Sequence, residues 1–200
     1  MPEMLDIYTP EKEKLGTMDK RHYYRLEDDI PWIKCCTCFV IDNKKKNILF
    51  EKRGKRFLDP GKLDLCSGHV QSNEVPIQGM VRELDEELSI PERIARNLYY
   101  LGEIPIDYTQ LNDETNKKNM KCFVSCYALG LMDSSIISLD GREAISMGWL
   151  NFEDSIGFIK NNMTRIPYEK SLEKYYNPIF EKLEKYIYPI KNFEKEEIKW

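Results

Sequence analysis

The segment Gly68–Ile90, GHVQSNEVPIQGMVRELDEELSI, constrains the fold and chemistry of this chain more than any other. Its second half predicts a helix, with a proline suited to the first turn and leucines on one apolar stripe. On that helix Glu83, Glu86 and Glu87 stand at i, i+3 and i+4 and share one face. Carboxylates packed so closely destabilise a helix unless a cation compensates them, and Mg²⁺ is a cation that oxygen ligands suit. The spacing therefore predicts metal-assisted chemistry on a phosphate-bearing substrate.

A simpler interpretation of these charges is a solvated helix face on which Arg82 forms weak surface ion pairs. The residues before the helix argue against it. Gly68 follows a short strand-like segment, residues 63–66, and is separated by five residues from Glu74. Seven further residues separate Glu74 from Arg82 and the acidic cluster. A pattern of this length is much more specific than an acidic triplet alone.

The whole pattern resembles the Nudix box, G-x5-E-x7-R-E-U-x-E-E-x-G-U, in which U is an aliphatic residue. Ser89 departs from it, since the family has a glycine there that ends the helix in a left-handed conformation. We therefore expect the end of this helix to differ in shape, while the acidic positions are intact. Residues 143–150 also resemble a later strand of the family, so the likeness covers about residues 32–160.

The rest of the chain alternates strand-like and helix-like segments. Strands are predicted at residues 32–41, 48–52, 63–66, 98–106, 121–130 and 144–150. Asn151 is a candidate cap for a helix starting near residue 152. A terminal helix is predicted after Pro167, with a break or restart at Asn177–Pro178. This order predicts an α/β fold with a mixed sheet between helices, in agreement with the Nudix α/β/α sandwich that the resemblance implies.

Three parts of the chain are expected to differ in role. The predicted divisions are an N-terminal hairpin extension over 1–31, a Nudix domain over 32–160, and a C-terminal helical extension packed on the domain over 161–200. A chain of 200 residues is long enough to bury a substantial core.

Composition excludes several classes of partner. The 30 Lys and Arg residues against 34 Asp and Glu residues leave a net charge of -4, which gives no reason to expect binding to a nucleic acid polymer. No apolar run approaches the roughly twenty residues that cross a bilayer, so we expect no membrane partner. The N-terminus is acidic and interrupted by prolines, unlike a signal peptide. We expect a cytoplasmic protein that acts on a small molecule.

The six cysteines allow two interpretations. Strand alternation places Cys36 with Cys38 on one face, and Cys122 with Cys126 on one face. A zinc site across two strands is conceivable, but the chain has no C-x-x-C spacing. Reduced thiols that pack as small apolar side chains are the favoured interpretation.

The resemblance implies roles for the residues of the box. Nudix enzymes generally hydrolyse a nucleoside diphosphate linked to another moiety, with Mg²⁺ or Mn²⁺. Glu83, Glu86 and Glu87 match the metal ligands of the family, and the Gly68 carbonyl is a further candidate ligand. Glu86 is the first choice for the general base, and Glu83 is a second candidate catalytic residue.

Other residues are assigned supporting roles. Arg82 and Glu74 match the family's residues that brace the loop against the helix. A loop with Arg53, Lys55 and Arg56 precedes the motif and is a candidate for binding substrate phosphate, the alternative being a solvated basic turn. Further candidates are Asp113 and Glu114 as a loop base, and His69 as a hydrogen-bonding residue or, less favoured, a metal ligand.

A second hypothesis has the same fold and another reaction. The layout of residues 5–8, Gly16, Arg21–His22, 59–64 and Gly68–His69 resembles the isopentenyl-diphosphate isomerase-like branch of Nudix proteins. Those isomerases protonate carbon, with a cysteine beside the Gly-His pair and a glutamate near a metal held by histidines and glutamates.

The match to the isomerases is partial. Ser67 stands in the expected place of the cysteine, because Cys66 lies one residue too early. Trp32 replaces a histidine, and Lys118 and Met120 stand at the acidic positions. We therefore favour a hydrolase built on this branch over an isomerase. A Nudix module that only binds nucleotides is a third hypothesis, disfavoured by the intact glutamates. A homodimer is conceivable from family habit alone.

Overall fold

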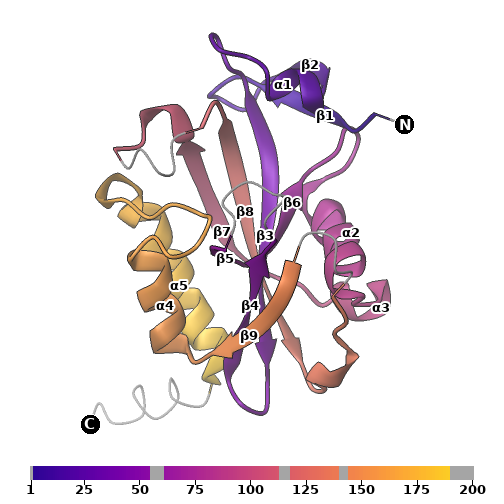
Figure 1. Ribbon diagram of the computed structural model, residues 1–200, viewed down its shortest axis with the longest axis vertical. Helices are drawn as coiled ribbons and strands as arrows, with labels where there is room; N and C mark the ends of the chain where they lie inside the picture. The colour runs from indigo at the N-terminus through magenta and orange to yellow at the C-terminus, as the bar shows by residue number, and fades with distance from the viewer. Residues whose placement is uncertain (1, 55–60, 113–117, 140–143, 190–200) are drawn as a thin grey trace, which may run out of the picture.

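The computed structural model of the protein describes residues 2–54, 61–112, 118–139 and 144–189. A mixed β-sheet forms the middle layer, with helices on both of its faces (Figure 1). The long strand β3 (Trp32–Asp42) organises this sheet. It pairs in parallel with β8 (Lys121–Leu131) over its whole length and is antiparallel to β6 (Cys66–His69) and β4 (Asn47–Arg53). The predicted α/β fold with a mixed sheet is confirmed.

Nine strands are present in the part of the chain that the structure describes. The remaining strands are β1 (Met4–Tyr8), β2 (Lys14–Asp19), β5 (Leu63–Asp64), β7 (Tyr99–Asp107) and β9 (Ala144–Leu150). The helices are α1 (Lys20–Tyr23), α2 (Pro76–Leu88), α3 (Glu92–Ala95), α4 (Phe152–Lys160) and α5 (Glu173–Ile187), with 3₁₀ turns at Tyr108–Gln110, Ser134–Ile136 and Lys170–Leu172. No helix within the described ranges has the length and apolar character needed to cross a membrane.

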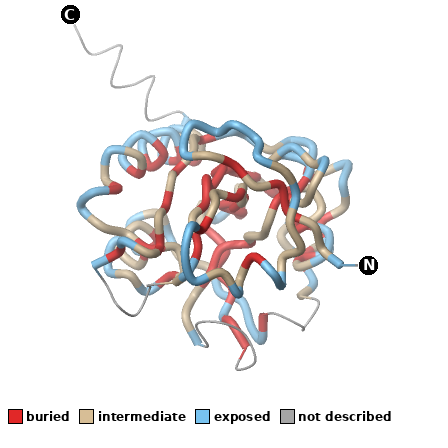
Figure 2. The backbone as a smooth tube through the Cα atoms, turned by 90° about the horizontal axis from the view of Figure 1, so that it is seen from above, coloured by how far each residue is buried: buried red, intermediate tan, exposed pale blue. Residues whose placement is uncertain are grey.

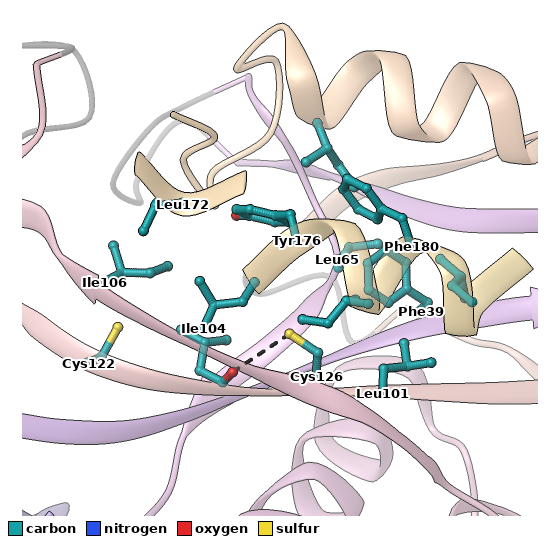
Figure 3. Packing of buried hydrophobic residues seen from close by; sticks show 14 of the residues in the cluster. Phe39, Leu65, Leu101, Ile104, Ile106, Cys122, Cys126, Leu172, Tyr176 and Phe180 are labelled. Carbon is teal, nitrogen blue, oxygen red and sulfur yellow. Dashed lines mark hydrogen bonds between the residues drawn. The ribbon is translucent and has the colours of Figure 1, made fainter. Parts of the chain in front are cut away.

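The sheet separates two apolar cores. Helices α2 and α3 cover one face, while α4 and α5 cover the other (Figure 1). Alternation along β8 sends Cys122 and Cys126 toward α5 and Tyr127 toward α2. Figure 3 shows Tyr176 and Phe180 of α5 packed over strand residues on the first of these faces. The most buried parts of the backbone lie between the helical layers (Figure 2).

The N-terminal residues form a β1–β2 hairpin that continues into the sheet. Tyr8 pairs with Trp32 at the start of β3, and Leu5 forms an isolated bridge with Gln71. Behind the hairpin, Tyr23 of α1 is fully buried, and its hydroxyl accepts a hydrogen bond of 3.0 Å from the Lys121 amide. The hairpin and α1 are thereby tied to the strands that surround the site described below.

Two local predictions differ from the structure. The strand expected over 63–66 is divided, because β5 pairs with β4 whereas β6 pairs with β3, and the buried Leu65 lies between them. The break expected at Asn177–Pro178 is wrong, since α5 runs without interruption from Glu173 to Ile187. Proline in a helix interior costs about 3 kcal/mol or more. Burial of the apolar face of α5 against the sheet offsets that cost.

The end of α2 is also not shaped as expected. Ser89 adopts the left-handed conformation, with φ 55° and ψ 30°, that glycine would adopt. The Ser89 amide donates to the Asp85 carbonyl, and the Ile90 amide donates to the Leu84 carbonyl. Ile90 is fully buried in the core beneath α2. This burial and the two hydrogen bonds hold the usual helix end in spite of the serine side chain.

We expect Ser89→Gly to stabilise the protein, because it removes a Cβ from a left-handed residue. That relief, about 1–2 kcal/mol, is partly offset by the freedom glycine adds to the unfolded chain, which leaves a gain of roughly 0.5–1 kcal/mol. Urea unfolding of the two proteins measures the difference. Ser89→Ala, which keeps the Cβ, is the matched control and should show no gain. Equal stability of the glycine variant and the parent would contradict the prediction.

Candidate metal and phosphate site

The site begins where α2 meets β6. A Cβ atom added to Gly68 would lie 2.0 Å from Glu83 Oε1 and 2.1 Å from its Cδ, far inside van der Waals contact. Only a residue without a side chain therefore lets the Glu83 carboxylate lie against the β6 backbone. The residue is required by this close approach rather than by an unusual backbone angle.

Arg82 binds both ends of the motif. Its Nε donates to Glu74 Oε1 at 3.0 Å, and its Nη2 donates to Glu74 Oε2 at 3.2 Å and to the His69 carbonyl at 2.9 Å. Glu74 Oε2 also accepts from the Gln71 amide at 2.9 Å. Burial acts to raise the pKa of Glu74, but the hydrogen bonds from Arg82 and Gln71 outweigh it and lower that pKa. The loop between β6 and α2 is thus fastened to the helix by one bidentate ion pair.

The three glutamates of the helix face have different surroundings. Glu83 is buried and accepts from Arg82 Nη1 at 2.7 Å. Glu86 accepts from the same Nη1 at 3.2 Å, but its side chain is 53% exposed. Glu87 Oε2 accepts from the Ser67 amide at 3.3 Å. Burial raises the pKa of Glu83, although Arg82 counteracts part of this effect. An additional positive charge near Glu83 would therefore favour its ionised form.

Glu51 is a member of the site that the sequence patterns missed. It lies on β4, is buried, and shares with Cys66 and Glu87 a space in which their potential ligand atoms all lie within 4.8 Å of one another. In the described part of the chain, this is the one group of three or more such side chains. A carboxylate that directly follows the apolar run Ile48–Phe50 of a predicted strand is the signal that could have revealed it.

The donor chemistry of this edge fits a hard divalent ion. Glu87 and Glu51 have carboxylate oxygens in one shared space, Glu83 lies against the backbone of Gly68, and the Gly68 carbonyl belongs to β6. Burial raises the pKa of the Cys66 thiol well above its usual value, so the site without an ion presents a thiol rather than a thiolate. Oxygen donors without thiolate suit Mg²⁺ or Mn²⁺ better than zinc.

The two cysteine pairs of the sheet face opposite cores. Cys36 and Cys38 pack in the core beneath α2, and Cys122 and Cys126 pack in the core beneath α5. A zinc site that combines the two pairs is therefore wrong, because the sheet lies between them. All six cysteines are free thiols, and five of them are buried.

Of the three predicted phosphate-binding residues, Arg53 lies within the described part of the chain. Arg53 is the last residue of β4 and is buried in an ion pair with Asp64, with 3.0 Å between Nη1 and Oδ2. The predictions for Lys55 and Arg56, and for Asp113 and Glu114, fall outside the described residues. Arg53 alone is therefore placed, in a buried strand position rather than on a loop surface.

His69 has a hydrogen-bonding partner rather than other potential metal ligands around it. Its Nε2 lies 2.6 Å from the Tyr24 hydroxyl. Burial, followed by the charges of Lys20, Arg165 and Arg82, lowers the pKa of His69 well below its usual value. The imidazole is thus neutral at physiological pH. No group of three potential ligands within the described ranges contains a histidine, and His22 is exposed.

Comparisons with known proteins agree with this geometry. A family model described as the NUDIX domain matches residues 34–173, which is more than half of the chain. The chain therefore belongs to the NUDIX domain family, and the predicted class of Nudix hydrolases is confirmed. No curated protein sequence matches it.

Solved structures show the same fold at low sequence identity. The DR0079 protein from Deinococcus radiodurans is 19% identical with a TM-score of 0.60, and the match covers 86% of this chain and 96% of that one. A MutT protein from Methanosarcina mazei Go1 is 20% identical with a TM-score of 0.54, covering 80% and 97%. A bifunctional NMN adenylyltransferase/ADP ribose pyrophosphatase from Francisella tularensis is 21% identical with a TM-score of 0.50, covering 82% and 44%.

The ion pair between Glu74 and Arg82 should make stability depend on pH. Because the folded-state pKa of Glu74 is lowered, its contribution is present above the usual glutamate value of about 4.3 and is lost as the pH falls through the lowered pKa. We expect Glu74→Gln to cost about 1–2 kcal/mol at pH 7 and much less near pH 3. Urea unfolding at both pH values measures the difference in free energy of unfolding between the parent and the variant. A difference that does not become smaller in acid would refute this account.

Gly68→Ala should damage the site more than the fold. The new methyl group would force the Glu83 side chain away from β6, since the two would otherwise overlap. We expect affinity for Mg²⁺ or Mn²⁺ to fall by about 10- to 100-fold, the range seen when the surroundings of a metal ligand are disturbed. Calorimetric titration with Mn²⁺ measures this, and Gly157→Ala is the control because a Cβ there meets no atom within 4 Å. Equal Mn²⁺ affinity in the Gly68 variant and the parent would show that the contact is unimportant.

Proposed function

We propose that this protein is a Mg²⁺-dependent hydrolase of a diphosphate linkage, in a nucleoside diphosphate derivative or a related small diphosphate. The observation that carries the proposal is the position of Glu83 and Glu87 against the backbone of Gly68 and Ser67. Three conditions for binding a hard cation meet there: carboxylates, a close strand backbone, and a fastening arginine. The Francisella tularensis protein with the same fold is named in part as a pyrophosphatase, which agrees with this chemistry.

The proposed roles of the residues differ with their burial. Glu83 and Glu87, with Glu51 from the neighbouring strand, would hold the ion, which Mn²⁺ could replace. When bound, the ion supplies charge neutralisation for the diphosphate and a lower pKa for bound water. Glu86, half exposed beside them, is the residue we assign as general base, because its carboxylate is open to water. Arg82 and Glu74 hold the loop and helix in register.

The relation to the isomerase-like branch is part of the proposal. The Gly68–His69 pair and the N-terminal hairpin resemble that branch in layout, and Tyr24 behind the hairpin contacts His69. Cys66 packs beneath α2, whereas Ser67 and Met120 line the cavity on the other side of β6. Neither the hydroxyl of Ser67 nor the thioether of Met120 can donate a proton to carbon as a carboxylic acid or a thiol does. We therefore favour hydrolysis over isomerisation.

We also propose the division of the chain into a hairpin extension over 1–31, a catalytic domain over 32–160 and a C-terminal extension over 161–200. The hairpin supports the site through Tyr23 and Tyr24. Helix α5 buries its apolar face on the sheet opposite α2. Both extensions pack against the middle part, which carries the glutamates of the motif.

A panel of nucleoside diphosphate derivatives and simpler diphosphates, assayed with Mg²⁺ for phosphate or monophosphate release, tests the activity. We expect Glu87→Gln and Glu86→Gln each to lower the rate by about 10²–10⁴-fold, through loss of ion binding and of the base respectively. Glu92→Gln is the matched control, since Glu92 is exposed on α3 and pairs only with Arg96 among the described residues.

Full activity in both of the first two variants would exclude this assignment of the glutamates. Incorporation of deuterium into isopentenyl diphosphate would establish the isomerase instead. Tight nucleotide binding without cleavage of any panel member would favour a binding module.

A further inference from the structure

A small cavity lies on the other side of the β6 backbone from Glu83. Its volume is about 40 Å³, and it is lined by β3, β6 and β8 together with residues 165–166. Ser67 and His69 face it from β6, and Gly68 borders both this cavity and the glutamate edge. The cavity is thus one strand away from the proposed site of hydrolysis.

The walls of the cavity are neutral except for one side chain. Cys35, Met120 and Val124 contribute apolar surface. Burial raises the pKa of the Tyr108 hydroxyl, which is uncharged at physiological pH. His69 contributes its imidazole, whose Nε2 lies 2.6 Å from the Tyr24 hydroxyl. The exception is Arg165, which follows α4 and its loop and whose guanidinium is always charged.

Arg165 is weakly paired. Its Nη1 lies 3.5 Å from Asp64 Oδ2, and its backbone amide donates to the Leu63 carbonyl. The same oxygen of Asp64 accepts a shorter bond of 3.0 Å from Arg53. The Arg165 side chain is only 20% exposed. A guanidinium has five N–H donors, and within the described residues this one uses a single donor in a long bond.

Positive charge converges on this end of β6 from three parts of the chain. Lys20, Arg82 and Arg165 all act on the imidazole of His69. Lys20 forms an ion pair with Glu3, with 2.8 Å between Nζ and Oε2, and Arg82 forms ion pairs with three glutamates. Arg165 is the member of this group whose pairing with carboxylate is weakest. A partly desolvated cation with unused donors attracts a compact anion strongly.

We propose that this cavity is a phosphate subsite, with Arg165 as its anchor. It would hold a phosphoryl group of the diphosphate substrate while the glutamates act on the linkage across Gly68. This rests on the proposed function for the identity of the substrate. The volume corresponds to a few water molecules, which suits phosphate oxygens and excludes a nucleobase. Specificity at this end is therefore for a phosphoryl group rather than for a base.

Binding of inorganic phosphate and of methylenediphosphonate, a diphosphate analogue that cannot be hydrolysed at its bridge, tests the subsite by calorimetry with Mg²⁺ present. We expect Arg165→Gln to weaken diphosphonate binding by about 10- to 100-fold, the range for hydrogen bonds between charged groups. Arg165→Lys keeps the charge and should recover part of the affinity. Arg96→Gln, an exposed arginine on the helix side, should bind as the parent does.

Circular dichroism and urea unfolding separate binding from folding. Unchanged diphosphonate affinity in Arg165→Gln overturns the proposal. So does an equal loss of affinity and of stability in both Arg165 variants, because that result would make Arg165 a structural partner of Asp64 only.

The panel assay separates failure of this subsite from failure of the proposed function. Hydrolysis at the parent KM in Arg165→Gln would leave the function intact and remove the subsite. Binding that depends on Arg165 without hydrolysis of any panel member would retain the subsite and remove the function. A raised KM with a nearly unchanged kcat in Arg165→Gln supports both the subsite and the proposed function.

Discussion

The contact between the Glu83 carboxylate and the backbone of Gly68 is the constraint on which the site depends. It requires that one residue of β6 has no side chain and that α2 approaches the sheet closely enough for a glutamate to reach the strand. Arg82 then holds Glu83, Glu74 and the His69 carbonyl together. Because these bonds join strand, loop and helix, the position of each glutamate follows from a single packed junction.

The junction also explains why carboxylates can be concentrated there. Burial disfavours the charged form of Glu83, and one arginine compensates only part of the negative charge of the group. A site arranged in this way is stabilised further by a divalent cation. Glu51 adds a further buried carboxylate from β4, so the sheet as well as the motif helix supplies oxygen donors. This concentration of carboxylates is the basis on which we propose a divalent cation at the site.

Strand β6 gives the two sides of this region different characters. The side under α2 has glutamates and a protonated thiol, whereas the opposite side has a neutral cavity with Arg165. Opposite charges are therefore separated by one layer of backbone. Tyr24, from the segment after the N-terminal hairpin, holds the imidazole of His69 at the edge of that cavity. Segments outside the motif thus contribute to both the shape and the charge of the site.

The sequence alone determined what depends on short-range spacing. The motif, the helix face of Glu83, Glu86 and Glu87, and most of the strands could be predicted, because periodicity and fixed separations act within a few turns. The division of residues 63–66 between two strands, the left-handed Ser89 and the unbroken helix through Pro178 were decided by burial and strand register. Glu51 and Arg165 are far from the motif in the chain. Only the tertiary structure could bring them beside it, since the pairing of distant strands and loops is set by packing of the whole sheet rather than by any local pattern.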